Sequence, residues 1–180
     1  MARSLKLEET GFLNQFGDLP VMQVRFNFYP PSSRTEVFGV KPHSDRSGIT
    51  VLLQYREVEG LQVLKDGAWY TVPVIPDALV VNLGDQMQYH YVKYDWVGGE
   101  FADNDKWDIQ SPVHRVWTNA NKLRLSFALF SKPEAEKEIG PVYCFIDETR
   151  SRLYRNVRNF TAFNYECFQK GKVALEEVRI

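Results

Sequence analysis

The chain has 180 residues, of which 44% are hydrophobic, so it is long enough to bury one core without disulfides or a structural metal. Its 22 basic and 23 acidic residues nearly cancel, which argues against the large positive field that nucleic-acid binding requires. The two cysteines lack metal-ligand spacing, and the sequence has no apolar run typical of a signal peptide or a membrane span. We therefore expect a protein of the cytoplasm or nucleus that does not bind membranes.

Residues 2–14 show the pattern of an amphipathic helix, and Gly11 is expected to stop this helix. Residues 21–29 (VMQVRFNFY) alternate apolar with polar side chains, as expected for a half-buried strand. Pro30 follows this stretch and ends it, because proline lacks the amide hydrogen that a strand ladder needs.

Short strands separated by turn residues follow along the middle of the chain. The turn signals include Asp66-Gly67 and Gly84-Asp85. Further strands are expected at residues 49–54, 61–64, 69–72, 78–83, 113–118 and 123–131. This spacing predicts a mainly β sandwich or barrel of the jelly-roll type.

Two stretches depart from the strand pattern. Residues 89–110 are rich in aromatic side chains but show no sustained period, which predicts a long irregular excursion. Residues 164–180 predict a C-terminal helix that Gly171 weakens in the middle. We therefore expect one mainly β domain over residues 1–180, with helices at its N- and C-terminal ends.

His43 and Asp45 are the first candidate site residues. They stand two residues apart on an expected strand, so their side chains share one face. An imidazole and a carboxylate are two of the three ligands of the facial triad that binds Fe(II) in oxygenases. The alternative is a solvated turn, but the strongly apolar stretch at residues 49–54 places the pair at the mouth of a buried element.

The third ligand has two candidates, His114 and His90. His114 lies between valines on the predicted strand at residues 113–118, where it is either a ligand or a core histidine with one hydrogen bond. Its distance in sequence from His43 is no obstacle, because jelly-roll strands far apart in sequence pair in space. His90 stands between two tyrosines in the irregular stretch, where a solvated side chain is the stronger interpretation.

Arg124 and Ser126 share one face of a predicted strand in the segment LRLSFALF. An arginine that points into an apolar barrel is costly unless it is paired. The carboxylate of a small molecule would pair with its guanidinium fork, and Ser126 and Tyr29 would add hydrogen bonds. An outward-facing arginine on an edge strand is the alternative.

Three motifs together resemble those of a known family, the plant 2-oxoglutarate- and Fe(II)-dependent dioxygenases. Residues 27–31 (NFYPP) are similar to the family's NxYPP, residues 43–45 (HSD) with His114 to its HxD and distal histidine, and residues 124–126 (RLS) to its RxS. Their joint occurrence in this order is highly specific, and the resemblance is closest to the senescence-related and alkaloid-demethylase-like branch. It covers nearly the whole chain except residues 89–110.

The resemblance implies a double-stranded β-helix, a cupin-like jelly roll, that uses Fe(II), 2-oxoglutarate as cosubstrate, O2 and, as an optional addition, ascorbate. It implies that the iron ligands, which are also the catalytic residues, are His43, Asp45 and His114. It also implies that the far carboxylate of 2-oxoglutarate is held by Arg124 and Ser126, with help from Tyr29 and Asn27.

The substrate site is less well marked. Phe130 occupies a position that often stacks on an aromatic substrate in relatives. Arg25 either lines the mouth of the same substrate pocket or lies on the surface. From the resemblance we expect hydroxylation, demethylation or desaturation of a small plant metabolite. The oligomeric state is left open.

Two departures from the family pattern support an alternative function. Only 26 residues precede Asn27, so the N-terminal helical domain of the family is expected to be missing, and residues 89–110 resemble an atypical insertion. The alternative is a truncated jelly roll, weakly active or inactive, that binds metal or ligand or associates with full-length relatives. A cupin-like metal protein without 2-oxoglutarate is disfavoured by Arg124 and Ser126.

Overall fold

The structure is a computed structural model that describes residues 9–10, 13–33, 37–55, 57–90, 110–141 and 152–180. The chain forms two compact units, which are described separately. The β unit comprises Met22–Gly84 and Ser111–Ser131. The helical unit comprises Met1–Val21, Asp85–Gln110 and Lys132–Ile180.

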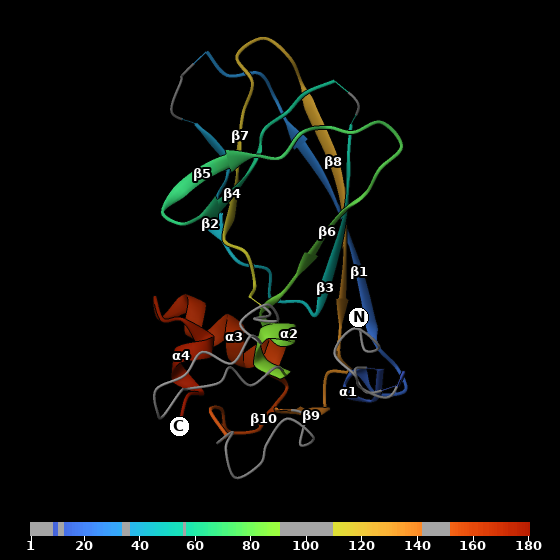
Figure 1. The fold of residues 1–180 in the computed structure, drawn as a ribbon, viewed down its shortest axis with the longest axis vertical. Helices are drawn as coiled ribbons and strands as arrows, with labels where there is room; N and C mark the ends of the chain where they lie inside the picture. Colours follow the sequence, from blue (N-terminus) through green and yellow to red (C-terminus); the bar gives the residue numbers. More distant parts are fainter. Residues whose placement is uncertain (1–8, 11–12, 34–36, 56, 91–109, 142–151) are drawn as a thin grey trace, which may run out of the picture. The chain divides into compact units, whose positions relative to one another are not determined.

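The β unit is built on two four-stranded sheets, which Figure 1 shows facing each other. The strands of the first sheet are, in order, β1 (Val21–Tyr29), β8 (Arg124–Lys132), β3 (Ile49–Gln54) and β6 (Val80–Leu83). Those of the second sheet are, in order, β2 (Phe38–His43), β7 (His114–Trp117), β4 (Leu61–Lys65) and β5 (Ala68–Thr71). Strands far apart in sequence are therefore neighbours, and the predicted jelly roll is confirmed.

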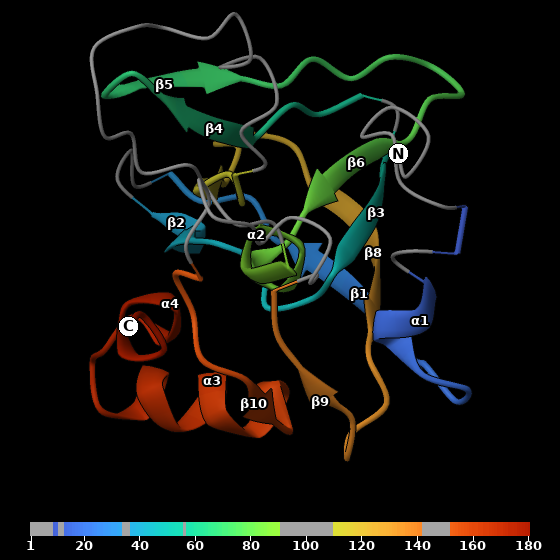
Figure 2. The same ribbon diagram turned by 60° about the horizontal axis from the view of Figure 1, so that its bottom comes forward.

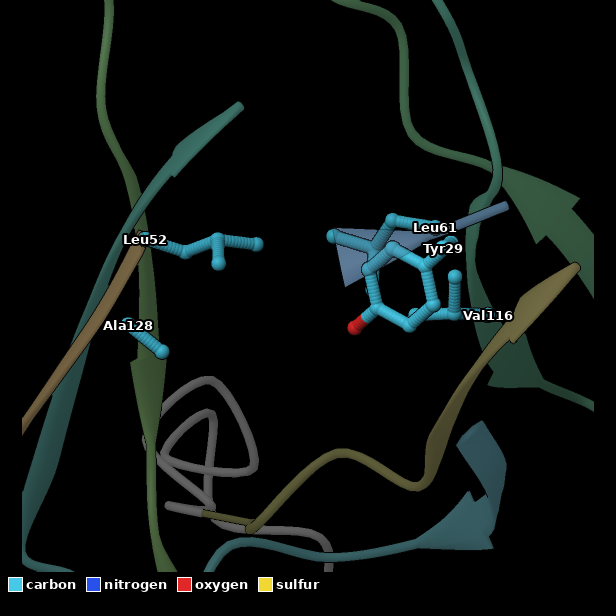
Figure 3. Packing of buried hydrophobic residues seen from close by; sticks show 5 residues of the cluster. All are labelled: Tyr29, Leu52, Leu61, Val116 and Ala128. Atoms are coloured by element: carbon cyan, nitrogen blue, oxygen red, sulfur yellow. The ribbon is translucent and has the colours of Figure 1, made fainter. Parts of the chain in front are cut away.

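The core of the β unit lies between the two sheets. Figure 3 shows Leu52 and Ala128 from the first sheet pointing toward Leu61 and Val116 from the second, with Tyr29 beside them. All five side chains are buried. This core surrounds a cavity in which polar side chains of the same strands meet.

β1 has the predicted bounds, but its apolar side faces outward. Phe26 is 73% exposed and Phe28 is 66% exposed, whereas Arg25, Asn27 and Tyr29 line the cavity of the β unit. The expectation of a strand that buries its apolar face is therefore wrong for β1. A period of two shows that a strand has two different faces, but the polar face is the inner one here.

The hairpin between β4 and β5 turns at Asp66 and Gly67, as predicted. Both residues have positive φ angles, 51° and 76°. Two successive positive φ angles are the mark of a type I′ turn, whose twist suits an antiparallel hairpin. A glycine adopts this conformation without the Cβ penalty.

The helical unit contains four short helices and one short ladder among its described residues. The helices are α1 (Leu13–Phe16), α2 (Asp85–His90), α3 (Phe160–Gln169) and α4 (Ala174–Glu177), and the ladder pairs β9 (Glu138–Ile139) with β10 (Val157–Arg158). Figure 2 shows α3 beside α4 and β10. Their buried residues form one cluster of Tyr89, Ile139, Val157, Phe160 and Val178.

Three expectations for the helical segments need correction or remain open. The single helix expected at residues 164–180 is wrong, because the chain forms α3 and α4 with Gly171 between them at a φ of 68°. Tyr89 and His90 end α2, so the irregular stretch does not begin at Tyr89. Residues 91–109 and most of the helix expected at 2–14 lie outside the described residues.

Candidate metal centre

Two strand ends bring His43, Asp45 and His114 together in the β unit. His43 is the last residue of β2 and pairs in register with His114, the first residue of β7. Asp45 lies two residues beyond the end of β2, so the expectation that it shares a strand with His43 is wrong. The three side chains nevertheless converge, and one potential ligand atom from each lies within 4.8 Å of the others.

The two imidazoles present their Nε2 atoms to one carboxylate oxygen. His43 Nε2 lies 3.8 Å and His114 Nε2 3.6 Å from Asp45 Oδ1, and the ring centroids are 4.4 Å apart. His43 Nδ1 lies 2.8 Å from the carbonyl oxygen of Lys41, and His114 Nδ1 lies 3.0 Å from that of Pro112. A carbonyl only accepts, so each Nδ1 carries the hydrogen and each Nε2 is left as a lone-pair donor.

One oxygen of the Asp45 carboxylate, Oδ2, has no hydrogen-bond partner among the described residues. The residue is 6% exposed, and its Oδ2 atom is buried without a hydrogen bond within the part of the chain that the structure describes. A buried, unpaired carboxylate oxygen is costly unless a cation satisfies it. Two imidazole nitrogens and this carboxylate form the donor set that suits Fe(II) with open coordination positions, so these residues fit an iron ion.

The charge state of His43 also favours metal binding. Burial lowers the pKa of His43 from its usual value of 6.5, and the neighbouring His114 and Arg25 lower it further, against the opposing effects of the Lys41 carbonyl and Asp45. The neutral imidazole is the form that donates a lone pair to a metal.

The loop that carries Asp45 is held by close backbone contacts. The amide of Gly84 donates to the carbonyl of Gly48 at 2.9 Å, and Ser47 and Thr50 share a hydroxyl hydrogen bond of 2.8 Å. A Cβ atom on Gly84 would lie 1.9 Å from the carbonyl oxygen of Ser47. Only glycine fits here, because no real side chain carbon approaches a backbone atom so closely.

Arg124 is a buried cation with unpaired donors. The residue is 1% exposed, and its Nη2 atom donates to Gln54 Oε1 at 3.0 Å, while the guanidinium lies 5.1 Å from the Tyr29 ring. Its Nε and Nη1 atoms are buried and have no hydrogen-bond partner within the described chain. Burial lowers the pKa of Arg124, and Tyr29 opposes this shift. Free donors on a buried guanidinium fit a ligand carboxylate.

The remaining predicted site residues line the same cavity, which has an empty volume of about 490 Å³ including its open mouth. Asn27 Nδ2 donates to Ser126 Oγ at 3.2 Å, beside Arg124 on the inner face of β8. The Arg25 guanidinium lies 5.7 Å from the centre of the Phe130 ring, and both side chains line the cavity. The structure therefore brings all nine predicted site residues to one cavity of the β unit.

Two polar cavity residues, Thr50 and Asn82, escaped the sequence analysis, and so did Gln54, which contacts the cavity residue Arg124. Thr50 and Gln54 are buried with Leu52 on the inner face of β3. The signal was available, since polar residues at every second position of an apolar strand share its inner face. The rival ligand His90 ends α2, and its side chain lies outside what the structure describes.

Comparisons with known proteins agree with this geometry. The model of the 2OG-Fe(II) oxygenase superfamily matches residues 20–133, more than half of the chain. An oxoglutarate-dependent flavonoid 7-O-demethylase of Ocimum basilicum is 38% identical over 89% of this chain and 40% of its own length. Codeine O-demethylase of Papaver somniferum is 35% identical over 100% of this chain and 47% of its own length.

A solved structure is similar over almost the whole chain. The crystal structure of JOX2 in complex with 2OG, Fe and JA has a TM-score of 0.83 and 32% identity, and the match covers 99% of this chain and 50% of that one. The chain thus spans about half the length of the curated relatives it matches. Within the described residues, no helix is long and apolar enough to cross a membrane.

Proposed function

Because this chain belongs to the 2OG-Fe(II) oxygenase superfamily, we propose that it is an iron- and 2-oxoglutarate-dependent oxygenase that oxidises a small plant metabolite. The observation that carries the proposal is the pairing of two features in one cavity. The Asp45 carboxylate, whose Oδ2 atom has no partner among the described residues, lies beside two imidazole lone pairs, and the buried Arg124 guanidinium keeps two free donors.

In this proposal, His43, Asp45 and His114 would hold the iron. The Lys41 and Pro112 carbonyls fix the two imidazole rings in the tautomer that leaves Nε2 free, so the ligands are oriented before the metal arrives. Bound iron with 2-oxoglutarate and O2 would supply the oxidation chemistry, in which the cosubstrate is decarboxylated to succinate and the substrate is hydroxylated, demethylated or desaturated.

Arg124 and Ser126 would bind the far carboxylate of 2-oxoglutarate. Gln54 accepts from Nη2 and fixes the guanidinium, which leaves Nη1 free to donate to a carboxylate. Asn27 donates to Ser126 and fixes its hydroxyl oxygen. Tyr29 packs its ring beside the guanidinium and limits its movement. Their joint role is to place the cosubstrate in one orientation.

The test is calorimetric titration of the 180-residue chain with Mn(II) and then with 2-oxoglutarate, followed by an assay of succinate formation with Fe(II) and O2. We expect 2-oxoglutarate to bind only when metal is present and succinate to form. Loss of both binding steps in a folded chain would contradict the proposal.

A second candidate function is a jelly roll that binds metal and 2-oxoglutarate without efficient turnover. Binding of both ligands without succinate formation would support it. Succinate formation that depends on Asp45 would exclude it.

We also propose that the partners are small molecules and that the chain acts in the cytoplasm or nucleus. The net charge of -1 supports this choice over a nucleic-acid partner. Imaging of a fluorescent fusion tests the location, and retention of the fusion on a membrane fraction would contradict it.

A further inference from the structure

The outer face of the sheet formed by β1, β8, β3 and β6 is apolar on all four strands. Its positions alternate with those of the inner, cavity-side face, so they are the even-numbered residues of β1 and the odd-numbered residues of the other three strands. Within these described strands, Ser131 is the one polar residue at an outer position, and no outer position carries a charge. An antiparallel sheet whose second face meets water normally places polar side chains there.

The outer side chains form one continuous patch across the sheet. Phe26 of β1 contacts Phe127 of β8 edge to face, with the ring centroids 4.9 Å apart. Phe127 pairs in register with Leu53 of β3, and Val51 on the same face of β3 pairs with Val81 of β6. Figure 2 shows the four strands side by side in this order. We call this surface the outer patch.

The outer patch is larger than the apolar patches that monomeric proteins normally expose. The four outer residues of β1, together with Leu53, Val81 and Phe127, are each between 41% and 73% exposed. At roughly 150–200 Å² for a fully exposed side chain of this size, they present about 600–800 Å² of surface. The largest apolar patch of a typical monomer is about 300–600 Å². Such a surface indicates an interface with a partner.

A second copy of this chain fits the outer patch. In a twofold interface the same surface serves both partners, and a surface without charges can face itself without repulsion. Sheet faces pack on one another about 10 Å apart with interdigitated side chains, as in a β-sandwich. The estimated area is also close to the roughly 800 Å² that each partner buries in a stable interface. A strongly charged partner, by contrast, would find no charge to pair with.

On this basis we propose that the chain forms a homodimer in which two copies pack their outer patches face to face about a twofold axis. Phe26 and Phe28 are the most exposed aromatic side chains of the patch, and aromatic residues are enriched in interface cores. Arg25, Asn27 and Tyr29 point to the opposite side of β1, so a partner on the outer patch leaves the cavity open.

The first test is sedimentation equilibrium of the unaltered chain, without metal or 2-oxoglutarate, from about 1 to about 100 μM. We expect a single monomer–dimer equilibrium with a dissociation constant of about 10 μM or lower. A chain that stays monomeric at the highest concentration would overturn the proposal, and the patch would then belong to another segment of the chain or to a different protein. Open-ended association would also overturn it, because a twofold interface closes at two copies.

Variants assign the interface to the outer patch. Phe26→Lys and, separately, Val24→Lys should weaken the dimer about 30-fold or more, as for residues at the centre of an interface. Phe168→Lys is the matched control, since it replaces a phenyl ring that is 62% exposed on α3, and it should leave the dimer unchanged. A dimer that persists undiminished in both outer-patch variants would overturn the proposal.

Urea denaturation gives a second measurement that does not depend on any variant folding. Because a dimer is stabilised by mass action, the unfolding midpoint of the unaltered chain should rise with protein concentration. A midpoint that is independent of concentration would overturn the proposal. Neither measurement involves iron or 2-oxoglutarate, so failure of the dimer would leave the proposed function untouched.

Discussion

His43 and His114 face each other across β2 and β7, with their ring centroids 4.4 Å apart and both Nε2 atoms within 3.8 Å of the same oxygen of Asp45. Two protonated rings this close would repel each other, and His114 accordingly contributes to the lowered pKa of His43. As neutral rings they converge on one point. The arrangement therefore favours a bound cation over protons.

Asp45→Asn should reduce Mn(II) affinity by more than about 100-fold, because it removes the carboxylate charge and keeps the side chain's shape. Isothermal titration measures the affinity, and Asp18→Asn at an exposed position is the matched control. Unchanged Mn(II) affinity in Asp45→Asn would exclude Asp45 as a ligand.

Gln54→Glu should weaken 2-oxoglutarate binding by about tenfold or more and leave Mn(II) binding intact. The new carboxylate would pair with the Arg124 guanidinium, which Gln54 contacts at 3.0 Å, and would compete with the carboxylate of the ligand. Arg124→Met should have a larger effect of the same kind. If both variants lost metal and 2-oxoglutarate together, the cause would be unfolding of the β unit.

Gly84→Ala should destabilise the β unit by about 1–3 kcal/mol or more, because its Cβ would collide with the backbone at Ser47. The same collision would displace the loop that carries Asp45, so Mn(II) affinity should fall as well. Urea denaturation and metal titration measure the two effects. Gly67→Asn is the control, since a Cβ there meets nothing within 4 Å and asparagine tolerates a positive φ.

The lowered pKa of His43 makes the metal-free chain less stable in acid. At a pH just below 6.5 the unfolded chain binds a proton at this residue and the folded chain does not, so the free energy of unfolding falls as the pH falls. An NMR titration of the imidazole Cε1 hydrogen should give a midpoint below 6.5. A midpoint above 6.5 would mean that the folded state favours the charged ring. His43→Gln should reduce the acid sensitivity.

The sequence predicted most strands of the β unit because each alternates over a short apolar run between turn residues. The bounds of β1 and β3 matched the expectation, and Asp66-Gly67 formed the expected turn. Alternation does not say which face is inner, so the outward placement of Phe26 required the tertiary structure. The sequence indicated that Gly171 weakens the C-terminal helix. Whether the helix continues or divides into α3 and α4 at this glycine depends on packing.

The candidate site was predictable where residue type restricts the chemistry. Two histidines, an aspartate and a strand arginine belong to few kinds of site, so His43, Asp45, His114 and Arg124 stood out from the sequence. Gln54 did not stand out, because a glutamine has many uses and its importance comes from contact with Arg124, 70 residues away. Sequence patterns show local spacing, whereas this contact depends on the pairing of β3 with β8.

The most direct test is an anaerobic titration of the Fe(II)-loaded chain with 2-oxoglutarate. The measured signal is the visible charge-transfer absorption of a 2-oxo acid chelated to Fe(II). We expect this absorption to appear with the unaltered chain and with His90→Ala, to be lost in His114→Ala, and to require more 2-oxoglutarate in Arg124→Met. Absorption that survives in His114→Ala, or that disappears in His90→Ala, would contradict this expectation.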